Sequence, residues 1–426
     1  MAAADEEARM QASGQTADAD IVAGFDLRAL PPGFYDDPYP TWRALRRLSP
    51  IHPLPDGSLF LTRHADLFAI YRDTATFSSD KVVEFTPKFG AGSPLLEHHT
   101  TSLIFNDPPL HTRVRRLITG ALTPRAVAAM EPGVVSLVQR LLDGLEARGK
   151  GGAPVDLVEH FAAAIPIEVI GNLLDVPRDR RGPLRDWSLA ILGALEPAPT
   201  PAMLDLGNRA VTEFCDELRT LVAHRRRHPG NPEHDVLTRL IQGEAGGDRL
   251  DERELLQNCI FILNAGHETT TNLISNALHL LCEWPGERAR LIADPDGLMK
   301  TAVEEFLRFD SSVQLGNRRV LRDCTLSGTA LREGALLTLC IAGANRDPEV
   351  FEDPDRLDLG RQRNPHLGFA GGPHVCAGLA VARLEARVAL GMFLGRFPRY
   401  ALAGPAEREG RARFRGFRRL PVVLET

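Results

Sequence analysis

Apolar residues recur every three or four positions along most of this chain, a spacing that predicts amphipathic helices. Proline and glycine separate the helical segments, and a short helix is expected at Pro40 to Leu48. A strand pair is expected around Ser58 to Thr62, and a β-rich interval at 318–342. Further helices are expected over 109–121, 124–148, 155–174, 180–194, 202–227, 233–242 and 298–309. The predicted fold class is mainly α with a small β region.

The longest predicted helix begins at Asp251 and runs to about Glu283, just before Pro285. Asp251 and Glu254 have the spacing of a capping box, in which each side chain accepts from a backbone N–H at the helix start. A helix of about 33 residues is about 50 Å long at 1.5 Å per residue. It must cross the whole molecule.

Residues 80–105 show no sustained periodicity and are expected to form a long irregular segment. Such loops inside compact domains are usually functional, which favours a cover over a binding site. An ordinary surface loop without a binding role explains the pattern equally well.

Composition suits one large domain, expected over 25–426. The chain has 426 residues, 43% of them hydrophobic, and no linker, repeat or low-complexity block divides it. Residues 1–24 lack the basic and apolar regions of a signal peptide and are expected to form a disordered tail. The net charge of −6 gives no argument for nucleic acid.

The six cysteines are scattered without a CxxC pair, which indicates a reducing compartment. The longest apolar runs fall far short of the roughly 18–20 residues that span a bilayer. We therefore expect a soluble cytoplasmic protein with neither a membrane nor a nucleic-acid partner.

The segment Phe369 to Gly378, with the sequence Phe-Ala-Gly-Gly-Pro-His-Val-Cys-Ala-Gly, precedes a helical run from Leu379 to Leu394. It places Cys376 at the mouth of a helix, where free N–H groups and the positive end of the dipole favour a thiolate. Glycines let the backbone approach something flat, and a cysteine without a nearby partner does not hold zinc. These residues predict a thiolate ligand to a planar metal cofactor, which is haem.

This segment resembles the haem-binding loop of the cytochrome P450 family, Phe-Gly-x-Gly-x-His-x-Cys-x-Gly. The resemblance implies the triangular P450 fold, with haem b between the long central helix and the loop. It also implies Cys376 as the metal ligand and a soluble, monomeric bacterial type. Ala370 replaces the glycine at the second position of the pattern, which removes no ligand but bears on loop packing and iron potential. The matching positions are Phe369, Gly372, His374, Cys376 and Gly378. Of these, Phe369, His374 and Cys376 are expected at the cofactor.

The centre of the long helix, residues 265–270, has the sequence Ala-Gly-His-Glu-Thr-Thr. Glycine and consecutive threonines are poor helix formers, so a loosened hydrogen-bond ladder is expected here. The stretch is similar to the family's Ala/Gly-Gly-x-Asp/Glu-Thr-Thr motif, which implies Thr269 and Glu268 as the alcohol and acid of proton delivery. For the pattern alone, a helix kink with a solvated Glu and a core-facing Thr stays open.

His111 and Arg115, at positions i and i+4 of one helix, can grip a carboxylate from two sides. Their spacing resembles the family's His-x-x-x-Arg clamp on a haem propionate. The resemblance implies His374 and Arg318 as further propionate donors, although Arg319 leaves that assignment open by one position. A plain basic helix face is the alternative for the arginines around Arg115.

Glu305 and Arg308 have the spacing of the family's Glu-x-x-Arg pair, and residues 351–356 resemble its meander segment. The resemblance implies Arg356 as the third member of this structural ion-pair group.

A basic patch on the thiolate side is expected to steer an acidic ferredoxin. Its members are Arg113, Arg116, Arg361 and Arg363. The arginine-rich stretch Arg408 to Arg419 is expected to be a solvated turn and strand, with contact to nucleic acid or a partner left open.

By position relative to Thr269, Phe261 and Asn264 are expected to face a substrate cavity. Val313 and Leu315, which follow the Glu-x-x-Arg helix, are expected there as well. Mostly apolar walls with one amide predict a hydrophobic substrate of modest polarity.

The function implied is a haem-thiolate monooxygenase that uses O2 and hydroxylates or oxidatively demethylates a hydrophobic small molecule. Its electrons are expected from a separate ferredoxin and an NAD(P)H-dependent ferredoxin reductase. The alternatives are a peroxide-driven peroxygenase, which typically lacks the acid–alcohol pair, and a haem-binding sensor without catalysis.

Overall fold

Helices make up most of this protein, as the hydrophobic pattern predicts. The computed structural model describes residues 16–232, 235–243 and 249–425. The α-helices are α2 Tyr39–Leu48, α3 His64–Arg72, α4 Val82–Phe89, α5 Pro94–Thr101, α6 Leu110–Ala121, α7 Pro124–Arg148, α8 Ala164–Leu173, α9 Leu184–Gly193, α10 Pro201–Arg227, α11 Val236–Gln242, α12 Glu252–Glu283, α13 Pro285–Ala293, α14 Pro295–Phe309, α15 Ile341–Ala344 and α16 Leu379–Arg396. Short 3-10 segments are η1 Pro32–Phe34, η2 Leu103–Phe105, η3 Lys150–Gly152, η5 Arg178–Arg180 and η6 Gly372–His374, and η4 Val158–Ala162 is a π-helix.

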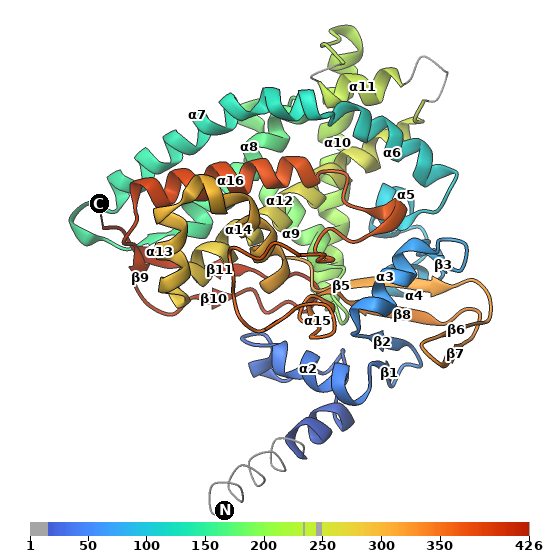
Figure 1. Ribbon diagram of the computed structural model, residues 1–426. Coiled ribbons are helices and arrows are strands. Elements are labelled where there is room, and N and C mark those ends of the chain that lie inside the picture. The colour runs from blue at the N-terminus through green and yellow to red at the C-terminus, as the bar shows by residue number, and fades with distance from the viewer. Residues whose placement is uncertain (1–15, 233–234, 244–248, 426) are drawn as a thin grey trace, which may run out of the picture.

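The largest sheet has five strands in the order β1-β2-β8-β5-β3, beside α2 and α3 in Figure 1. Within it β2 is parallel to β8, whereas β5 is antiparallel to β8. Because side chains alternate across a sheet, Leu315 and Arg318 of β5 point to opposite faces. The strands are β1 Ile51–Pro53, β2 Leu59–Leu61, β3 Phe77–Ser78, β4 Val155–Asp156, β5 Leu315–Val320, β6 Cys324–Leu326, β7 Thr329–Leu331, β8 Leu336–Cys340, β9 Ala401–Leu402, β10 Glu407–Arg408, β11 Phe417–Arg419 and β12 Pro421–Val423.

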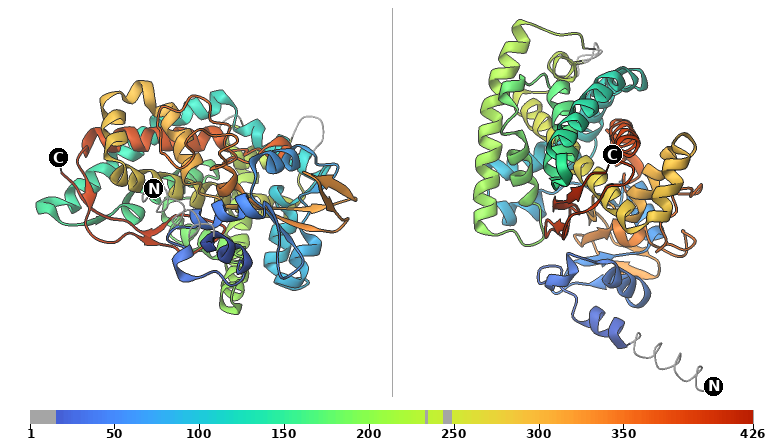
Figure 2. Two further views of the ribbon diagram at one scale, coloured as in Figure 1. Left: turned by 60° about the horizontal axis from the view of Figure 1, so that its bottom comes forward. Right: turned by 90° about the vertical axis from the view of Figure 1, so that its left-hand side faces the viewer.

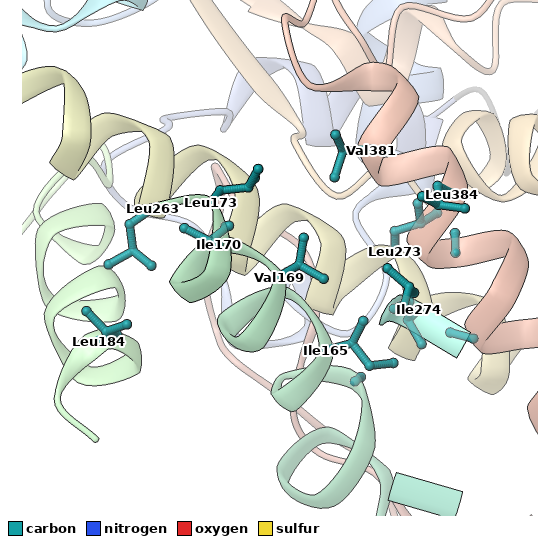
Figure 3. Packing of buried hydrophobic residues seen from close by; sticks show 14 of the residues in the cluster. Ile165, Val169, Ile170, Leu173, Leu184, Leu263, Leu273, Ile274, Val381 and Leu384 are labelled. Atoms are coloured by element: carbon teal, nitrogen blue, oxygen red, sulfur yellow. The ribbon is translucent and has the colours of Figure 1, made fainter. Parts of the chain in front are cut away.

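The long helix α12 runs through the middle of the helical part, as its length requires (Figures 1 and 2). Asp251 and Glu254 form the expected capping box, with Glu254 N–H donating to Asp251 at 2.7 Å. Helices α5, α8, α9, α10 and α16 all pack on α12. Figure 3 shows Leu384 of α16 next to Leu273 of α12 within the main hydrophobic cluster. Thr269 is one helical turn before Leu273, so α16 brings the Cys376 loop to this part of α12.

Residues 80–105 form α4, α5 and η2, so the expectation of an irregular segment is wrong. Each α-helix here has only eight residues, too few for a clear period. Phe85 and Phe89, one turn apart, are both buried, and Ser93 caps α5 by accepting from Leu96 N–H at 3.1 Å. Tertiary packing therefore stabilises helices that the local pattern does not predict.

The amino-terminal region differs in part from the expected tail over 1–24. Residues 16–23 are helical, whereas residues 1–15 lie outside the described part of the chain. Asp18 pairs with Arg47 of α2 at 2.6 Å, and Val22 packs against a core cluster around Trp42. These contacts explain why the segment is ordered. Within the described residues, no helix combines the length and apolar character needed to cross a membrane.

Candidate active site

The Cys376 loop is a tight turn held against α3. Cys376 N–H donates to the Phe369 carbonyl at 3.0 Å, and α16 begins three residues later, with Gly378 at its N-cap. Gly372 has φ +60°, and a β-carbon there would lie 2.0 Å from the Tyr71 carbonyl oxygen. Only glycine fits that position.

Ala370, the departure from the family pattern, has φ +57°, a left-handed conformation that costs an alanine roughly 1–2 kcal/mol. Ala370→Gly is expected to stabilise the protein by about 0.5–1 kcal/mol, since the greater unfolded-state freedom of glycine offsets part of the relief. The matched change Gly372→Ala is expected to destabilise it by more than about 2 kcal/mol through the clash with Tyr71. Urea unfolding measures both; an Ala370→Gly protein less stable than the parent contradicts the assignment of strain.

Burial dominates the environment of the Cys376 thiol and raises its pKa. The Gly378 N–H and the charges of Arg115 and Arg383 act in the opposite direction. The helix start and these two cations therefore act toward a thiolate, as predicted, against the effect of burial. A bound metal ion is what deprotonates a coordinating thiol. The described residues contain no group of three His, Cys, Asp or Glu side chains that could hold a metal, so Cys376 is not part of a zinc-type site.

His111 of α6 and His374 of the Cys376 loop come together, with ring centroids 4.0 Å apart. Both ring nitrogens of His111 and Nε2 of His374 are buried without a hydrogen-bond partner in the described part of the chain. Unpartnered buried nitrogens are costly and need an explanation. A carboxylate of a bound group would satisfy them.

Arg115 and Arg318 add two positive charges to this histidine pair. Burial lowers the pKa of His374 to about 2, with further lowering by the charges of Arg318, His111 and Arg115. Arg318 is buried over the Tyr71 ring at 5.1 Å, and neither arginine has an acidic ion-pair partner among the described residues. Asp107 lies close enough to act on His111 and Arg318, but its carboxylate accepts hydrogen bonds from Ser78 and Ser79. A largely buried cluster with this excess of basic groups fits the two propionates of haem.

The geometry of β5 distinguishes between Arg318 and Arg319 as the arginine on the cofactor side. Neighbouring residues of β5 point to opposite faces, and only Arg318 contacts Tyr71, against which Gly371 and Gly372 also pack. The structure therefore places Arg318, and not Arg319, on the face of the sheet that meets the Cys376 loop.

The motif at 265–270 lies within a continuous α-helix, so the expected loosening of the ladder is not observed. The Thr269 hydroxyl instead donates to the Ala265 carbonyl one turn earlier at 2.7 Å. Ala265 is exposed and Thr269 half-buried, whereas Glu268 is buried. The face of α12 that carries Ala265 and Thr269 is thus its open face.

Glu268 forms an ion pair with Arg411, from Nη1 to Oε1 at 2.6 Å. Burial raises the pKa of Glu268 to about 8, although the Arg411 charge opposes this. The solvated Glu of the alternative interpretation is therefore excluded. Sequence reasoning missed Arg411, which is 143 positions away and whose only signal was the unexplained arginine-rich stretch.

The expected pocket residues do not share one environment. Phe261 and Val313 are half-buried, consistent with a wall position. Asn264 is buried against α5, where its Nδ2 lies 3.4 Å from His98 Nε2. Leu315 requires a correction: its face of β5 packs into the cluster around Trp42, away from Arg318.

The Glu305–Arg308 pair is fully buried, at 2.8 Å. Its third member is Arg361, whose Nε lies 3.2 Å from Glu305 Oε2. The assignment to Arg356 is wrong, because Arg356 contributes only its backbone carbonyl, which accepts from Arg308 at 3.2 Å. The choice among arginines of the meander depends on its irregular path, which no local pattern encodes.

The comparisons with known proteins agree with this arrangement. Residues 194–400 match the family model described as Cytochrome P450. The Biotin biosynthesis cytochrome P450 of Bacillus subtilis is 34% identical and covers 92% of this chain and 97% of its own length. The Vitamin D(3) 25-hydroxylase of Pseudonocardia autotrophica is 36% identical, with 92% and 94% covered.

A solved structure extends the likeness to three dimensions. The crystal structure of P450BioI in complex with hexadec-9Z-enoic acid ligated Acyl Carrier Protein has a TM-score of 0.85 at 32% identity. It covers 92% of this chain and 100% of that chain. A likeness that spans nearly the whole chain rests on far more than one cysteine loop. The chain therefore belongs to the cytochrome P450 family and is a haem-thiolate monooxygenase.

Proposed function

We propose that this enzyme uses haem b, O2 and electrons from a separate ferredoxin to hydroxylate or oxidatively demethylate a hydrophobic small molecule. The observation that carries the proposal is the basic cluster beside Cys376. The cluster offers buried and half-buried donors that form no ion pair within the described residues, which suits the two carboxylates of haem b; its members are His111, Arg115, Arg318 and His374.

Each residue of the site has a distinct task in this proposal. Cys376 would supply the thiolate that holds the haem, and Phe369, at the start of the same loop, would line the cofactor. Thiolate-ligated haem supplies the O2-activating chemistry. Thr269 holds a proton at its hydroxyl, and Glu268 behind it passes protons inward from the Arg411 side. A sensor has no need of this acid–alcohol pair, which supports catalysis.

The substrate is proposed to be hydrophobic because Phe261 and Val313 offer apolar walls, with the amide of Asn264 as a polar group nearby. The relatives' printed names concern biotin biosynthesis and vitamin D(3), so they do not narrow the class. Spin-state absorption changes on titration with aromatic acids, terpenes, fatty acids and macrolides are the direct screen.

The proposed ferredoxin surface contains fewer arginines than the four that the sequence suggested. Arg113 pairs with Glu254, and Arg361 pairs with Glu305, so both are engaged within the protein. Arg116 and Arg363 are exposed. The six cysteines are unpaired thiols, which supports a reducing compartment such as the cytoplasm, where ferredoxins are found.

Reconstitution tests this function. With ferredoxin, reductase and a binding substrate, we expect substrate-dependent NAD(P)H consumption with product formation. Arg363→Glu is expected to slow reduction and to weaken its salt dependence, because it reverses one charge of the steering surface. Arg209→Glu on α10, a helix at the far edge of the molecule in Figure 2, is the matched control and should change neither.

Two outcomes oppose the proposal. Product formed only with added peroxide would favour a peroxygenase, and haem binding without product under either condition would favour a sensor. An unchanged reduction rate and salt dependence in Arg363→Glu would remove this arginine from the ferredoxin surface.

A further inference from the structure

Residues 411–417 of the arginine-rich segment 408–419 are buried or half-buried, so the expectation of a solvated turn and strand is wrong for them. Arg408 and Arg415 both pair with the buried Asp310, at 3.2 and 2.7 Å. Arg418, by contrast, is exposed and pairs with Glu407 at the surface. Buried acids explain the difference, because a charge inside a protein needs a partner.

Arg411 connects three parts of the molecule. Its Nη1 donates to Glu268 of α12 at 2.6 Å, and its Nη2 donates to the Leu189 carbonyl of α9 at 3.3 Å. Its Nε lies 3.7 Å from Glu409 in the same segment. One guanidinium thus holds both the acid of the proposed proton path and the helix packed beside it.

The residues that follow α9 are fastened to the same segment. The Glu196 carboxylate accepts from the backbone N–H of Ala412 at 2.8 Å, and Arg413 Nε donates to the Leu195 carbonyl at 3.1 Å. Lys88 of α4 donates to the Glu196 carbonyl at 2.7 Å. These bonds hold α9 against the arginine segment.

Glu268 faces one cation and two acids. Burial raises its pKa, Arg411 opposes the rise, and Glu409 and Glu196 reinforce it. Its second oxygen, Oε2, is buried and has no hydrogen-bond partner among the residues that the structure describes. The charge and direction of this carboxylate therefore depend on Arg411.

We propose that Arg411 is a positioning residue for proton delivery, which fixes the Glu268 carboxylate and ties it to the packing of residues 189–196 on α12. This inference rests on the proposed role of Glu268. Because the Arg411 guanidinium donates to both Glu268 and the Leu189 carbonyl of α9, we expect the orientation of the Glu268 carboxylate to depend on the position of α9.

The test uses the holoenzyme and follows the Glu268 carboxyl band by infrared spectroscopy as a function of pH. The band is assigned by its loss in Glu268→Gln. In Arg411→Gln we expect its titration to move upward by about 1–3 pH units, the usual effect of an opposite charge at short range. Arg411→Lys, which keeps the charge, is expected to restore most of the shift. A titration unchanged in Arg411→Gln overturns the proposal.

Glu409→Gln is a milder second variant, which removes a like charge without breaking the Arg411–Glu268 pair. It is expected to move the titration downward, opposite to Arg411→Gln. Arg418→Gln is the matched control in the same segment and is expected to move nothing, since its pair is exposed. An upward shift in Arg418→Gln as large as that in Arg411→Gln would mean that the segment acts only through general packing.

Two further readings complete the test. Amide hydrogen exchange over 189–196 is expected to quicken in Arg411→Gln and to stay at the parent rate in Arg418→Gln. Equal exchange rates in the two variants would show that Arg411 does not stabilise the packing of residues 189–196. Product formed per NAD(P)H is expected to fall in both Arg411→Gln and Glu268→Gln. If Glu268→Gln keeps the parent ratio, the proposed role of Glu268 fails; if Glu268→Gln lowers it and Arg411→Gln does not, only the Arg411 inference fails.

Discussion

Replacing Cys376 with serine is expected to abolish NAD(P)H-driven turnover while leaving the fold intact. The backbone bond from Cys376 N–H to the Phe369 carbonyl does not involve the side chain, so the loop can keep its course. A serine hydroxyl stays neutral near pH 7 and cannot donate charge to haem as a thiolate does. We expect the rate to fall by more than about 100-fold, the upper end of what loss of an outer-shell partner of a metal costs.

Haem content, turnover with ferredoxin and reductase, and unfolding by urea measure this effect together. Cys324→Ser is the matched control, since Cys324 is half-buried in the β6–β7 hairpin. It is expected to keep both haem and turnover. A Cys376→Ser enzyme that turns over at the parent rate would exclude Cys376 as the ligand.

Replacing Arg308 with alanine is expected to destabilise the protein by about 3–5 kcal/mol, the usual cost of breaking a buried ion pair. Arg308 and Glu305 are both 0% exposed and share two hydrogen bonds of 2.8 Å. Arg308 also donates to the carbonyls of Asn345 and Pro354, at 3.0 and 2.8 Å. The change therefore leaves a buried carboxylate and several carbonyls without their donor.

Urea unfolding of the holoenzyme measures this loss. Arg290→Ala is the matched control, because Arg290 makes the same i, i+3 pair with Glu287 but is half exposed, and it is expected to cost at most about 1 kcal/mol. Arg308→Lys is expected to recover only part of the stability, since an ammonium cannot reproduce the guanidinium fork. A cost for Arg308→Ala no larger than that of Arg290→Ala would contradict a structural role for the buried pair.

Patterns within a few residues of one another, such as a capping box or a regular apolar spacing, were enough to predict the long helix and the motif segments. The Asp251 capping box and the long apolar period predicted α12 to within one residue at its start. The spacing of His111 and Arg115, and the glycines before Cys376, predicted segments that the structure brings together. These patterns express constraints within a few residues of the chain.

Features that depend on distant packing could not be predicted in this way. The short helix α4 exists because Phe85 and Phe89 are buried by the rest of the protein, and α5 is held by its packing on α10 and α12. The partner of Glu268 lies 143 positions away, and Arg361 replaces Arg356 through the path of the meander. The environment of Leu315 follows from which face of β5 meets the Trp42 cluster. Each needs the three-dimensional arrangement.

The central claim is that Cys376 gives a thiolate to haem, and the absorption spectrum of the reduced protein with carbon monoxide tests it most directly. The account predicts the long-wavelength Soret band of a thiolate-ligated haem, lost in Cys376→Ser and kept in Cys324→Ser. A band at the shorter wavelength of a haem bound by histidine or a neutral thiol, in protein that is folded and fully loaded, would contradict it.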